Sequence, residues 1–212
     1  MTVAAPRSGG GVAYSDYGRE FRHGQGHINR PAFTHELSTE WLRAMPDVVA
    51  RLESARHPRI ADIGCGQGFS TLALAHAQDA GLDARVRFMC TDAGELASRG
   101  PYDLVLILEA LHDLADPAGA LRAALADGGT VLVVDEKVAH VFTAPGDEVE
   151  RMMYGWSVTH CLPTQQAEQP SAALGTVMRA GTVRELAAAA GYARVDVLPV
   201  DNDFFRLYRL DP

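Results

Sequence analysis

The sequence predicts an α/β fold, in which a doubly wound, mostly parallel sheet has an antiparallel C-terminal strand and is preceded by N-terminal helices. Three observations predict this fold. Short apolar runs alternate with Ala/Leu-rich stretches after Pro58, a glycine-rich turn follows the first run, and the last two runs lie close together in the chain. Continuous apolar runs are typical of parallel strands that are buried on both faces. We expect six strands.

The chain of 212 residues divides into three stretches. Residues 1–13 are small and Gly-rich, so we expect them to be disordered. Residues 14–57 are predicted to form a helical cover, and residues 58–212 the α/β domain. Apolar residues of the cover recur at helical spacing and are expected to pack on the sheet, namely Phe33, Leu37, Trp41 and Leu42.

The predicted strands follow one another in a simple order. The first four are residues 59–63, 85–91, 102–110 and 129–137. A helix that ends near Gly191 separates them from two final strands, which are close enough to pair antiparallel.

The charge and composition limit the partners. A net charge of −8 argues against nucleic acid and anionic membranes, because both attract clustered Lys and Arg. We therefore expect a small-molecule partner; the oligomeric state is not predicted. No apolar run approaches the roughly 18 residues that span a bilayer, and the first residues do not resemble a signal peptide. These features favour a cytoplasmic protein.

The three cysteines show no spacing that indicates a metal site. Cys65, Cys90 and Cys161 include no Cys-x-x-Cys pair. We expect reduced thiols, as is usual for a cytoplasmic chain.

The glycine-rich turn is the strongest functional motif. Gly64, Gly66 and Gly68 follow a predicted strand and precede a helix, which is the context of a nucleotide-binding loop. Glycines allow the backbone to turn sharply and to approach a ligand closely. Asp62 lies at the carboxyl end of the strand, where open α/β sheets bind ligands. The alternative is a tight turn that needs only flexibility.

At these residues the chain resembles the class I S-adenosylmethionine-dependent methyltransferases. The resemblance covers about residues 58–210 and rests on ADIGCGQG, FMCTDAGEL, PYDLVLILEALHDLADP and LADGGTVLVVDEKV. The segments YSDYGREFRHGQGHINRPAF and YGWSVTHCLP are similar to a bacterial subgroup whose members often carry a winged-helix domain ahead of the catalytic one. No such domain precedes the motif in this sequence.

The resemblance implies S-adenosylmethionine as the cofactor. It implies that the glycines Gly64, Gly66 and Gly68 surround the methionine part of this cofactor. It also implies that Asp62 orders the loop or binds the cofactor's amino group.

Three further residues take their expected roles from the resemblance. Asp92 and Ala93 would lie near the adenine, and Glu109 would line the pocket where cofactor and acceptor meet. Asp92 could instead cap a helix that begins near Ala93. Glu109 could instead be a solvated strand end.

Few side chains are candidates for acid–base chemistry. His112 follows the fourth strand of the family pattern and could accept a proton from a hydroxyl or amine, or it could be a loop histidine bonded to backbone. His160 and Cys161 are adjacent, and adjacent helical residues point in different directions, so a nucleophile pair is not expected. Asp135 and Glu136 could hold a metal, but no third candidate ligand follows them at a spacing that is typical of metal sites. We expect a solvated strand end and no metal.

Two segments are predicted to cover the mouth of the site. Residues 14–31 and 152–162 carry more aromatic and apolar side chains than one helix face can bury against a sheet.

One part of the family pattern is shortened. Residues 69–78 run almost directly into residues 85–91, so the resemblance implies that the family's second strand and much of its helix are missing from the sequence. We expect residues 85–91 to pair directly with residues 59–63, because an unpaired edge inside a sheet is costly. This pairing would bring Asp92 toward the ribose of the cofactor.

Two functional hypotheses follow, and a third is less consistent with the motif. The first is methyl transfer from S-adenosylmethionine to an O or N atom of a small molecule. The second is a catalytically silent cofactor-binding relative with a damaged adenosine pocket. The third is an NAD-linked oxidoreductase, whose usual Gly-x-Gly-x-x-Gly pattern would need glycine where Phe69 stands.

Overall fold

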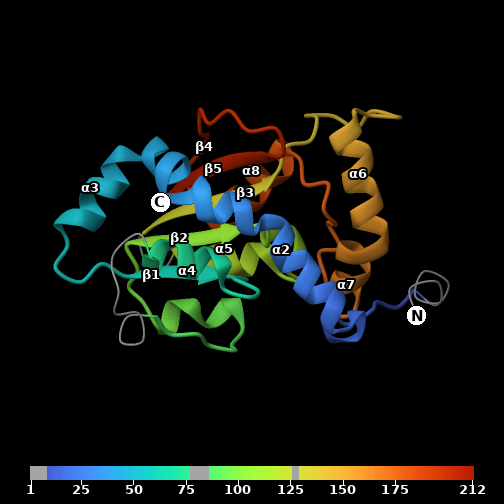
Figure 1. The fold of residues 1–212 in the computed structure, drawn as a ribbon, viewed down its shortest axis with the longest axis horizontal. Helices are drawn as coiled ribbons and strands as arrows, with labels where there is room; N and C mark the ends of the chain where they lie inside the picture. The colour runs from blue at the N-terminus through green and yellow to red at the C-terminus, as the bar shows by residue number, and fades with distance from the viewer. Residues whose placement is uncertain (1–8, 77–85, 126–128) are drawn as a thin grey trace.

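A computed structural model describes residues 9–76, 86–125 and 129–212 (Figure 1). These residues form one five-stranded sheet in the order β1-β2-β3-β5-β4. The strands are β1 (Ile60–Ile63), β2 (Leu104–Leu108), β3 (Thr130–Glu136), β4 (Arg194–Val197) and β5 (Phe205–Asp211). The first three are parallel to one another, whereas β5 is antiparallel to both β3 and β4. The α/β fold with an antiparallel C-terminal strand is thus confirmed.

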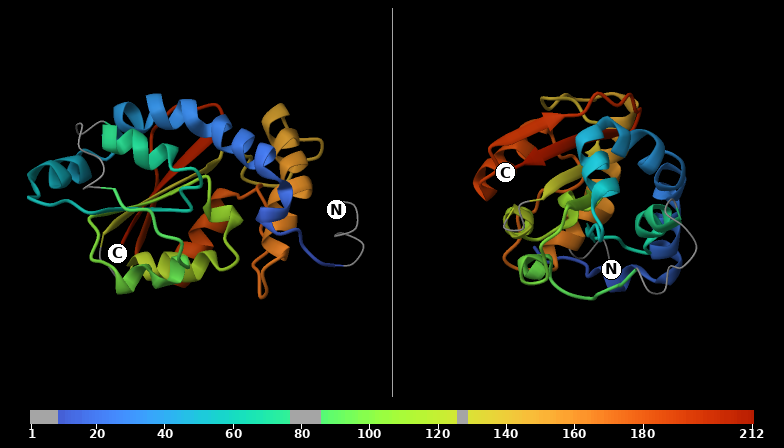
Figure 2. Two further views of the ribbon diagram at one scale, coloured as in Figure 1. Left: turned by 60° about the horizontal axis from the view of Figure 1, so that its bottom comes forward. Right: turned by 90° about the vertical axis from the view of Figure 1, so that its left-hand side faces the viewer.

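Helices cover both faces of the sheet (Figure 2). The α-helices are α2 (Arg19–His35), α3 (Pro46–Ser54), α4 (Phe69–His76), α5 (Pro117–Leu125), α6 (Glu148–Trp156), α7 (Leu162–Gln166) and α8 (Ala180–Ala190). The short helical turns are η1 (Tyr14–Tyr17), η2 (Leu37–Trp41), η3 (Leu42–Ala44), η5 (Ala93–Ser98), η6 (Leu111–Asp113) and η7 (Ser157–Cys161). The helices α2 and α4 lie on one face, and α5 lies on the other.

Strand β2 is buried on both faces, as its apolar run predicts. Leu104, Leu106 and Leu108 belong to the core beneath the N-terminal helices. Val105 and Ile107 belong to the core beneath α5 and α8. Side chains alternate between the two faces of a strand, so a run with no polar position is needed where helices cover both sides.

Trp41 joins the N-terminal helices to the sheet. Its side chain is fully buried in η2. The ring centroid lies 5.6 Å from that of Phe205 on β5 and 6.1 Å from that of Phe33 on α2. Its indole N–H donates to Glu36 Oε2 at 3.2 Å. The predicted apolar stripe of the helical cover therefore packs on the sheet.

Trp41→Ala is expected to lower the free energy of unfolding by about 3–5 kcal/mol, because it leaves a large cavity between cover and sheet. Chemical denaturation followed by circular dichroism measures the loss. Ile28→Ala serves as the control, since Ile28 lies on α2 and is 60% exposed; its effect should stay within about 0.5 kcal/mol. Equal stabilities for the two variants would contradict the packing role.

The predicted sixth strand is wrong. Residues 86–92 form no strand, and β2 is the strand that pairs with β1; residue 85 lies outside the described residues. The side chains of residues 87–92 are exposed, whereas a strand beside β1 in a parallel sheet needs cover on both faces. Phe88 instead approaches the glycine-rich turn. Among the described residues, β1 lies at the edge of the sheet.

The structure describes the N-terminal segment from residue 9 onward. Residues 1–8 of the predicted disordered stretch lie outside the described residues. Val12 is buried, and its N–H donates to Pro163 O at 2.9 Å. None of the helices in the described ranges is long and apolar enough to cross a membrane.

Candidate active site

The glycine-rich turn adopts a backbone that side chains disfavour. Gly64, Gly66 and Gly68 have φ angles of 69°, 53° and 78°. A Cβ on Gly64 would lie 2.6 Å from Ala110 Cβ, and one on Gly68 would lie 2.7 Å from the Phe88 ring. A Cβ on Gly66 would meet no heavy atom within 4 Å among the described residues. The first and third glycines therefore allow close packing, and the second faces open space that a ligand can enter.

Asp62 of β1 stabilises the glycine-rich turn through hydrogen bonds to residues that follow it. Its Oδ2 accepts hydrogen bonds from the hydroxyls of Ser70 and Thr71, each at 2.6 Å. Its Oδ1 is buried and has no hydrogen-bond partner within the described part of the chain. Burial raises the pKa of Asp62, although the two hydroxyls act in the opposite direction. One oxygen thus orders the loop, and the other is available for a cationic group of a ligand.

Helix α2 packs against the same turn. The side-chain amide of Gln67 donates to Arg22 O on α2 at 2.8 Å. On the same helix, the ring centroid of His27 lies 5.1 Å from that of Phe69, and the guanidinium of Arg30 lies 5.2 Å from it. The N-terminal helices are therefore part of the wall around the loop.

Glu109 ends β2 in an unusual backbone conformation. Its φ is 54°, and its N–H donates to Val134 O on β3 at 2.8 Å. Its Oε1 is buried without a partner among the residues described. Burial, with the charge of Asp135 second, raises the pKa of Glu109 to about 8. A non-glycine residue with positive φ is uncommon and is often found at a functional position.

His112 lies in η6 and is buried among carboxylates. Its Nδ1 lies 2.9 Å from Asp135 Oδ1 and 3.4 Å from Glu136 Oε2, and its Nε2 lies 3.5 Å from Asp113 Oδ1. These partners are side chains, so the alternative of a histidine bonded to backbone is wrong. Burial lowers the pKa of His112, but the charges of the three carboxylates outweigh it and raise the pKa well above 6.5.

Asp135 and Glu136 are not the solvated strand end that the sequence predicts. Their side chains are fully buried, because β3 lies between β2 and β5 in the middle of the sheet. Burial raises the pKa of Asp135, but the charge of His112 and hydrogen bonds outweigh the effect of burial. The pKa of Asp135 is therefore lowered. Burial, followed by the charge of Glu109, raises the pKa of Glu136. The carboxyl ends of neighbouring parallel strands thus form one cluster around His112.

Cys161 reaches this cluster from η7. The thiol is buried with its sulfur within 4.8 Å of a ring nitrogen of His112, and burial raises its pKa. The neighbouring His160 packs instead against aromatic rings, with centroid distances of 4.6 Å to Tyr17 and 4.8 Å to Phe21. Burial lowers the pKa of His160. The two adjacent side chains therefore diverge, as predicted for a helical turn.

The two predicted cover segments meet each other. Tyr17 of η1 donates its hydroxyl hydrogen to Thr159 O of η7 at 3.1 Å. Helix α2 and the pair α6 and α7 lie close together in Figure 1. The second segment also carries Cys161 to His112, so these helices lie beside His112 as well as beside the loop.

The structure separates the two predictions for Asp92. Its Oδ1 accepts a hydrogen bond from Gly94 N at 2.7 Å at the start of η5. The capping role is therefore correct. Ala93 is half-buried and packs on the core. Phe88 lies against Gly68, so the segment before Asp92 reaches the glycine-rich turn, and the ribose role stays a prediction.

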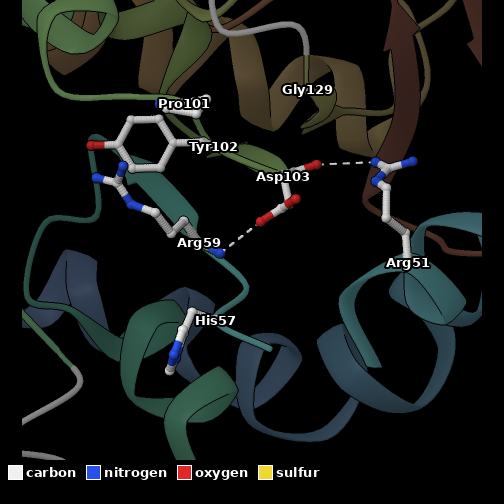
Figure 3. A pocket seen from close by; sticks show the side chains of 7 residues that line it. All are labelled: Arg51, His57, Arg59, Pro101, Tyr102, Asp103 and Gly129. Carbon is white, nitrogen blue, oxygen red and sulfur yellow. Dashed lines mark hydrogen bonds between the residues drawn. The ribbon is translucent and has the colours of Figure 1, made fainter. Parts of the chain in front are cut away.

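A separate cavity of about 340 Å³ lies at the amino ends of the strands (Figure 3). Its polar groups mainly hold the chain in place. Arg51 donates to Asp103 O at 3.0 Å, and Asp103 Oδ2 accepts from Arg59 N at 2.8 Å. The guanidinium of Arg59 stacks on the Tyr102 ring. Parallel α/β sheets bind ligands at the opposite, carboxyl edge, so we assign this cavity no catalytic role.

Sequence reasoning missed two members of the site. It gave Asp113 no role, and it considered Cys161 only beside His160. A usable signal existed for the carboxylates, since Glu109 and Asp135 close strands that are neighbours in a parallel sheet. No local signal places Cys161, which comes from a distant helix.

The α/β fold, together with the glycine-rich turn and the cluster around His112 at the carboxyl ends of the strands, defines a class I S-adenosylmethionine-dependent methyltransferase domain. The family model described as "Methyltransferase domain" matches residues 33–197. The chain therefore belongs to this methyltransferase family.

Solved structures show the same fold at low sequence identity. The methyltransferase SibL in its apo form has a TM-score of 0.59 and 18% identity over 89% of this chain and 56% of its own. PigF with SAH has a TM-score of 0.55 and 17% identity over 80% and 55%. Human N-acetylserotonin methyltransferase in complex with SAM has a TM-score of 0.55 and 16% identity over 99% and 65%. The chain thus spans little more than half of SibL and PigF.

Proposed function

We propose that the protein transfers the methyl group of S-adenosylmethionine to an O or N atom of a small molecule in the cytoplasm. The observation that carries the proposal is the buried pair of His112 and Asp135 at the carboxyl edge of the sheet. This pair lies at the carboxyl ends of β2 and β3. The glycine-rich turn follows the carboxyl end of the neighbouring parallel strand β1. Three free cysteines agree with a reducing compartment.

The residues at this edge fit the cofactor. The open space in front of Gly66 admits a ligand beside the backbone. The unpartnered Oδ1 of Asp62 and Oε1 of Glu109 are suited to its positively charged groups. Gly64 and Gly68 hold the loop against its neighbours. When bound, the cofactor supplies an electrophilic methyl group.

His112 is the proposed general base. A carboxylate can only accept, so the 2.9 Å contact with Asp135 places a hydrogen on Nδ1 and leaves Nε2 to take the proton of the acceptor. The acceptor atom forms its bond to the methyl carbon as the carbon–sulfur bond breaks, and S-adenosylhomocysteine leaves. In the free protein the surrounding carboxylates favour the protonated ring. The positive charge of the cofactor opposes this preference and favours the neutral base.

Asp92→Ala is expected to weaken cofactor binding by about 10- to 100-fold, the range for loss of a hydrogen bond to a charged group. Asp92 Oδ1 caps η5, and Oδ2 is the proposed partner of the ribose hydroxyls. Isothermal titration with S-adenosylhomocysteine measures the change. Asp92→Asn keeps a good cap, so it separates loss of the cap from loss of the carboxylate. Wild-type affinity in Asp92→Ala would exclude the ribose role.

A silent relative is the second candidate function, and one observation favours it. Residues 86–92 form no strand beside β1, so the adenosine side lacks the support that we expected. In that case the protein binds the cofactor without turning it over.

Two measurements test the proposal. Isothermal titration should show binding of S-adenosylhomocysteine and none of NAD. Incubation with methyl-labelled cofactor and fractionated metabolites should transfer label to a small molecule. Binding without transfer to any fraction would favour the silent relative, and binding of NAD alone would contradict the methyltransferase assignment.

A further inference from the structure

Two side chains of different chemistry, Asp113 and Cys161, lie beside His112. The ligand atoms of His112, Asp113 and Cys161 all lie within 4.8 Å of one another. The first two come from η6 and the third from η7. Asp113 Oδ1 is buried and lacks a hydrogen-bond partner in the part of the chain that the structure describes. An imidazole, a carboxylate and a thiol in one place are the donor set that Zn²⁺ prefers in proteins.

The spacing agrees with coordination of one ion. Ligands at about 2.0–2.3 Å from a tetrahedral zinc lie roughly 3.3–3.8 Å from one another. The distance between His112 Nε2 and Asp113 Oδ1 is 3.5 Å. The thiol sulfur lies within 4.8 Å of both other ligand atoms, so a shift of the Cys161 side chain toward them completes three protein ligands, and a fourth position stays open.

The support behind the imidazole is that of a metal ligand. A histidine that binds a metal commonly donates its other ring N–H to a carboxylate, which fixes the ring and its tautomer. His112 Nδ1 lies 2.9 Å from the fully buried Asp135. Its Nε2 consequently faces Asp113, at 3.5 Å from Oδ1, and becomes a metal ligand once its proton leaves.

We propose that His112, Asp113 and Cys161 bind Zn²⁺ and that the bound ion switches methyl transfer off. Binding releases two protons to the solvent: one leaves the Cys161 thiol, which becomes a thiolate, and the other leaves Nε2 of the protonated His112 ring. Because one lone pair cannot hold both a metal and a proton, zinc on Nε2 blocks the base. The inhibition rests on the proposed function of His112, whereas the binding of the ion does not.

The test uses the untagged full chain with neither cofactor nor acceptor. His23 and His27 are separated first, because they lie one helical turn apart on α2 with ring centroids at 4.4 Å and two histidines at that spacing can also bind zinc. In the His23→Gln background, titration of ZnCl₂ against a chromophoric chelator should show one site. Co²⁺ should give a sulfur-to-metal charge-transfer band.

Three variants in this background locate the site. Cys161→Ser should weaken zinc binding at least about 100-fold, more than the 10- to 100-fold typical of an outer-shell change, and should abolish the cobalt band. Asp113→Asn should weaken binding by a similar factor. Cys90→Ser should bind as the parent does, since Cys90 is an exposed cysteine far from η7 in sequence. Circular dichroism confirms that each variant is folded.

Two results would overturn the proposal. The first is no zinc binding by the folded parent. The second is Cys161→Ser binding zinc as tightly as the parent. Turnover separates this proposal from the proposed function. If the metal-free protein has no activity, the methyltransferase proposal fails and the titration still decides the site. If zinc-loaded protein retains full activity, the blocking role is wrong.

Discussion

Gly66→Val is expected to abolish binding of S-adenosylhomocysteine while most of the fold is retained. Gly66 has a φ of 53° and faces open space within the turn. A branched side chain would fill the space in which the cofactor meets the backbone. It would also strain the turn by about 1–2 kcal/mol, since left-handed backbone disfavours a Cβ. Isothermal titration measures the affinity, and circular dichroism measures the fold.

A second glycine provides the matched control. Gly18 has a φ of 80° and also has open space around its Cβ position among the described residues, but it lies at the start of α2. Because its ψ of 161° also lies in a region essentially restricted to glycine, Gly18→Val should carry substantial backbone strain and still keep cofactor affinity. Unchanged affinity in Gly66→Val would remove the turn from the site, and equal loss in both variants would attribute the effect to strain.

His112→Gln is expected to lower the rate of methyl transfer by about 10²- to 10⁴-fold, the contribution typical of a general base. Glutamine keeps a polar side chain near Asp135 but accepts no proton at neutral pH. The affinity for S-adenosylhomocysteine should change little, because His112 is not among the residues proposed to hold the cofactor. Single-turnover assays with methyl-labelled cofactor and the acceptor found by the metabolite screen measure the rate.

Two further variants show whether the loss is chemical. Asp135→Asn should also slow transfer, because an amide no longer fixes the hydrogen on Nδ1. His140→Gln should leave the rate unchanged, since His140 is exposed. A wild-type rate in folded His112→Gln would show that another group accepts the proton or that the acceptor needs no base.

Local sequence patterns predicted the parts of the structure that depend on the backbone. The apolar run of β2 indicated a strand covered on both faces, and Leu104–Leu108 is buried throughout. The glycines at 64, 66 and 68 indicated a tight loop, and all three have positive φ. The spacing of Trp41 with its neighbours indicated a helical face, and that face packs on the sheet. Each of these patterns involves residues that lie within about two helical turns or one strand of each other in the chain.

The sixth strand shows where such patterns stop being sufficient. Residues 85–91 form a short apolar run that is typical of a strand, but a strand exists only where a neighbour supplies hydrogen bonds and both faces find cover. In the structure residues 87–92 are exposed, and Phe88 packs on Gly68. Phe88 therefore contacts the glycine-rich loop, and the predicted hydrogen-bonded pairing of this segment with β1 does not form.

The sequence by itself determined the α/β class, the position of the glycine-rich loop and the identity of His112 as a candidate base, since each is encoded in a short stretch of chain. Only the tertiary structure decided what surrounds that base. Asp135 reaches it because β2 and β3 are neighbours in register, and Cys161 of η7 lies with its sulfur within 4.8 Å of a His112 ring nitrogen. These contacts join residues that are far apart in the chain. Their burial then changes the pKa values of His112, Asp135, Glu136 and Cys161, because charges removed from water interact strongly with one another.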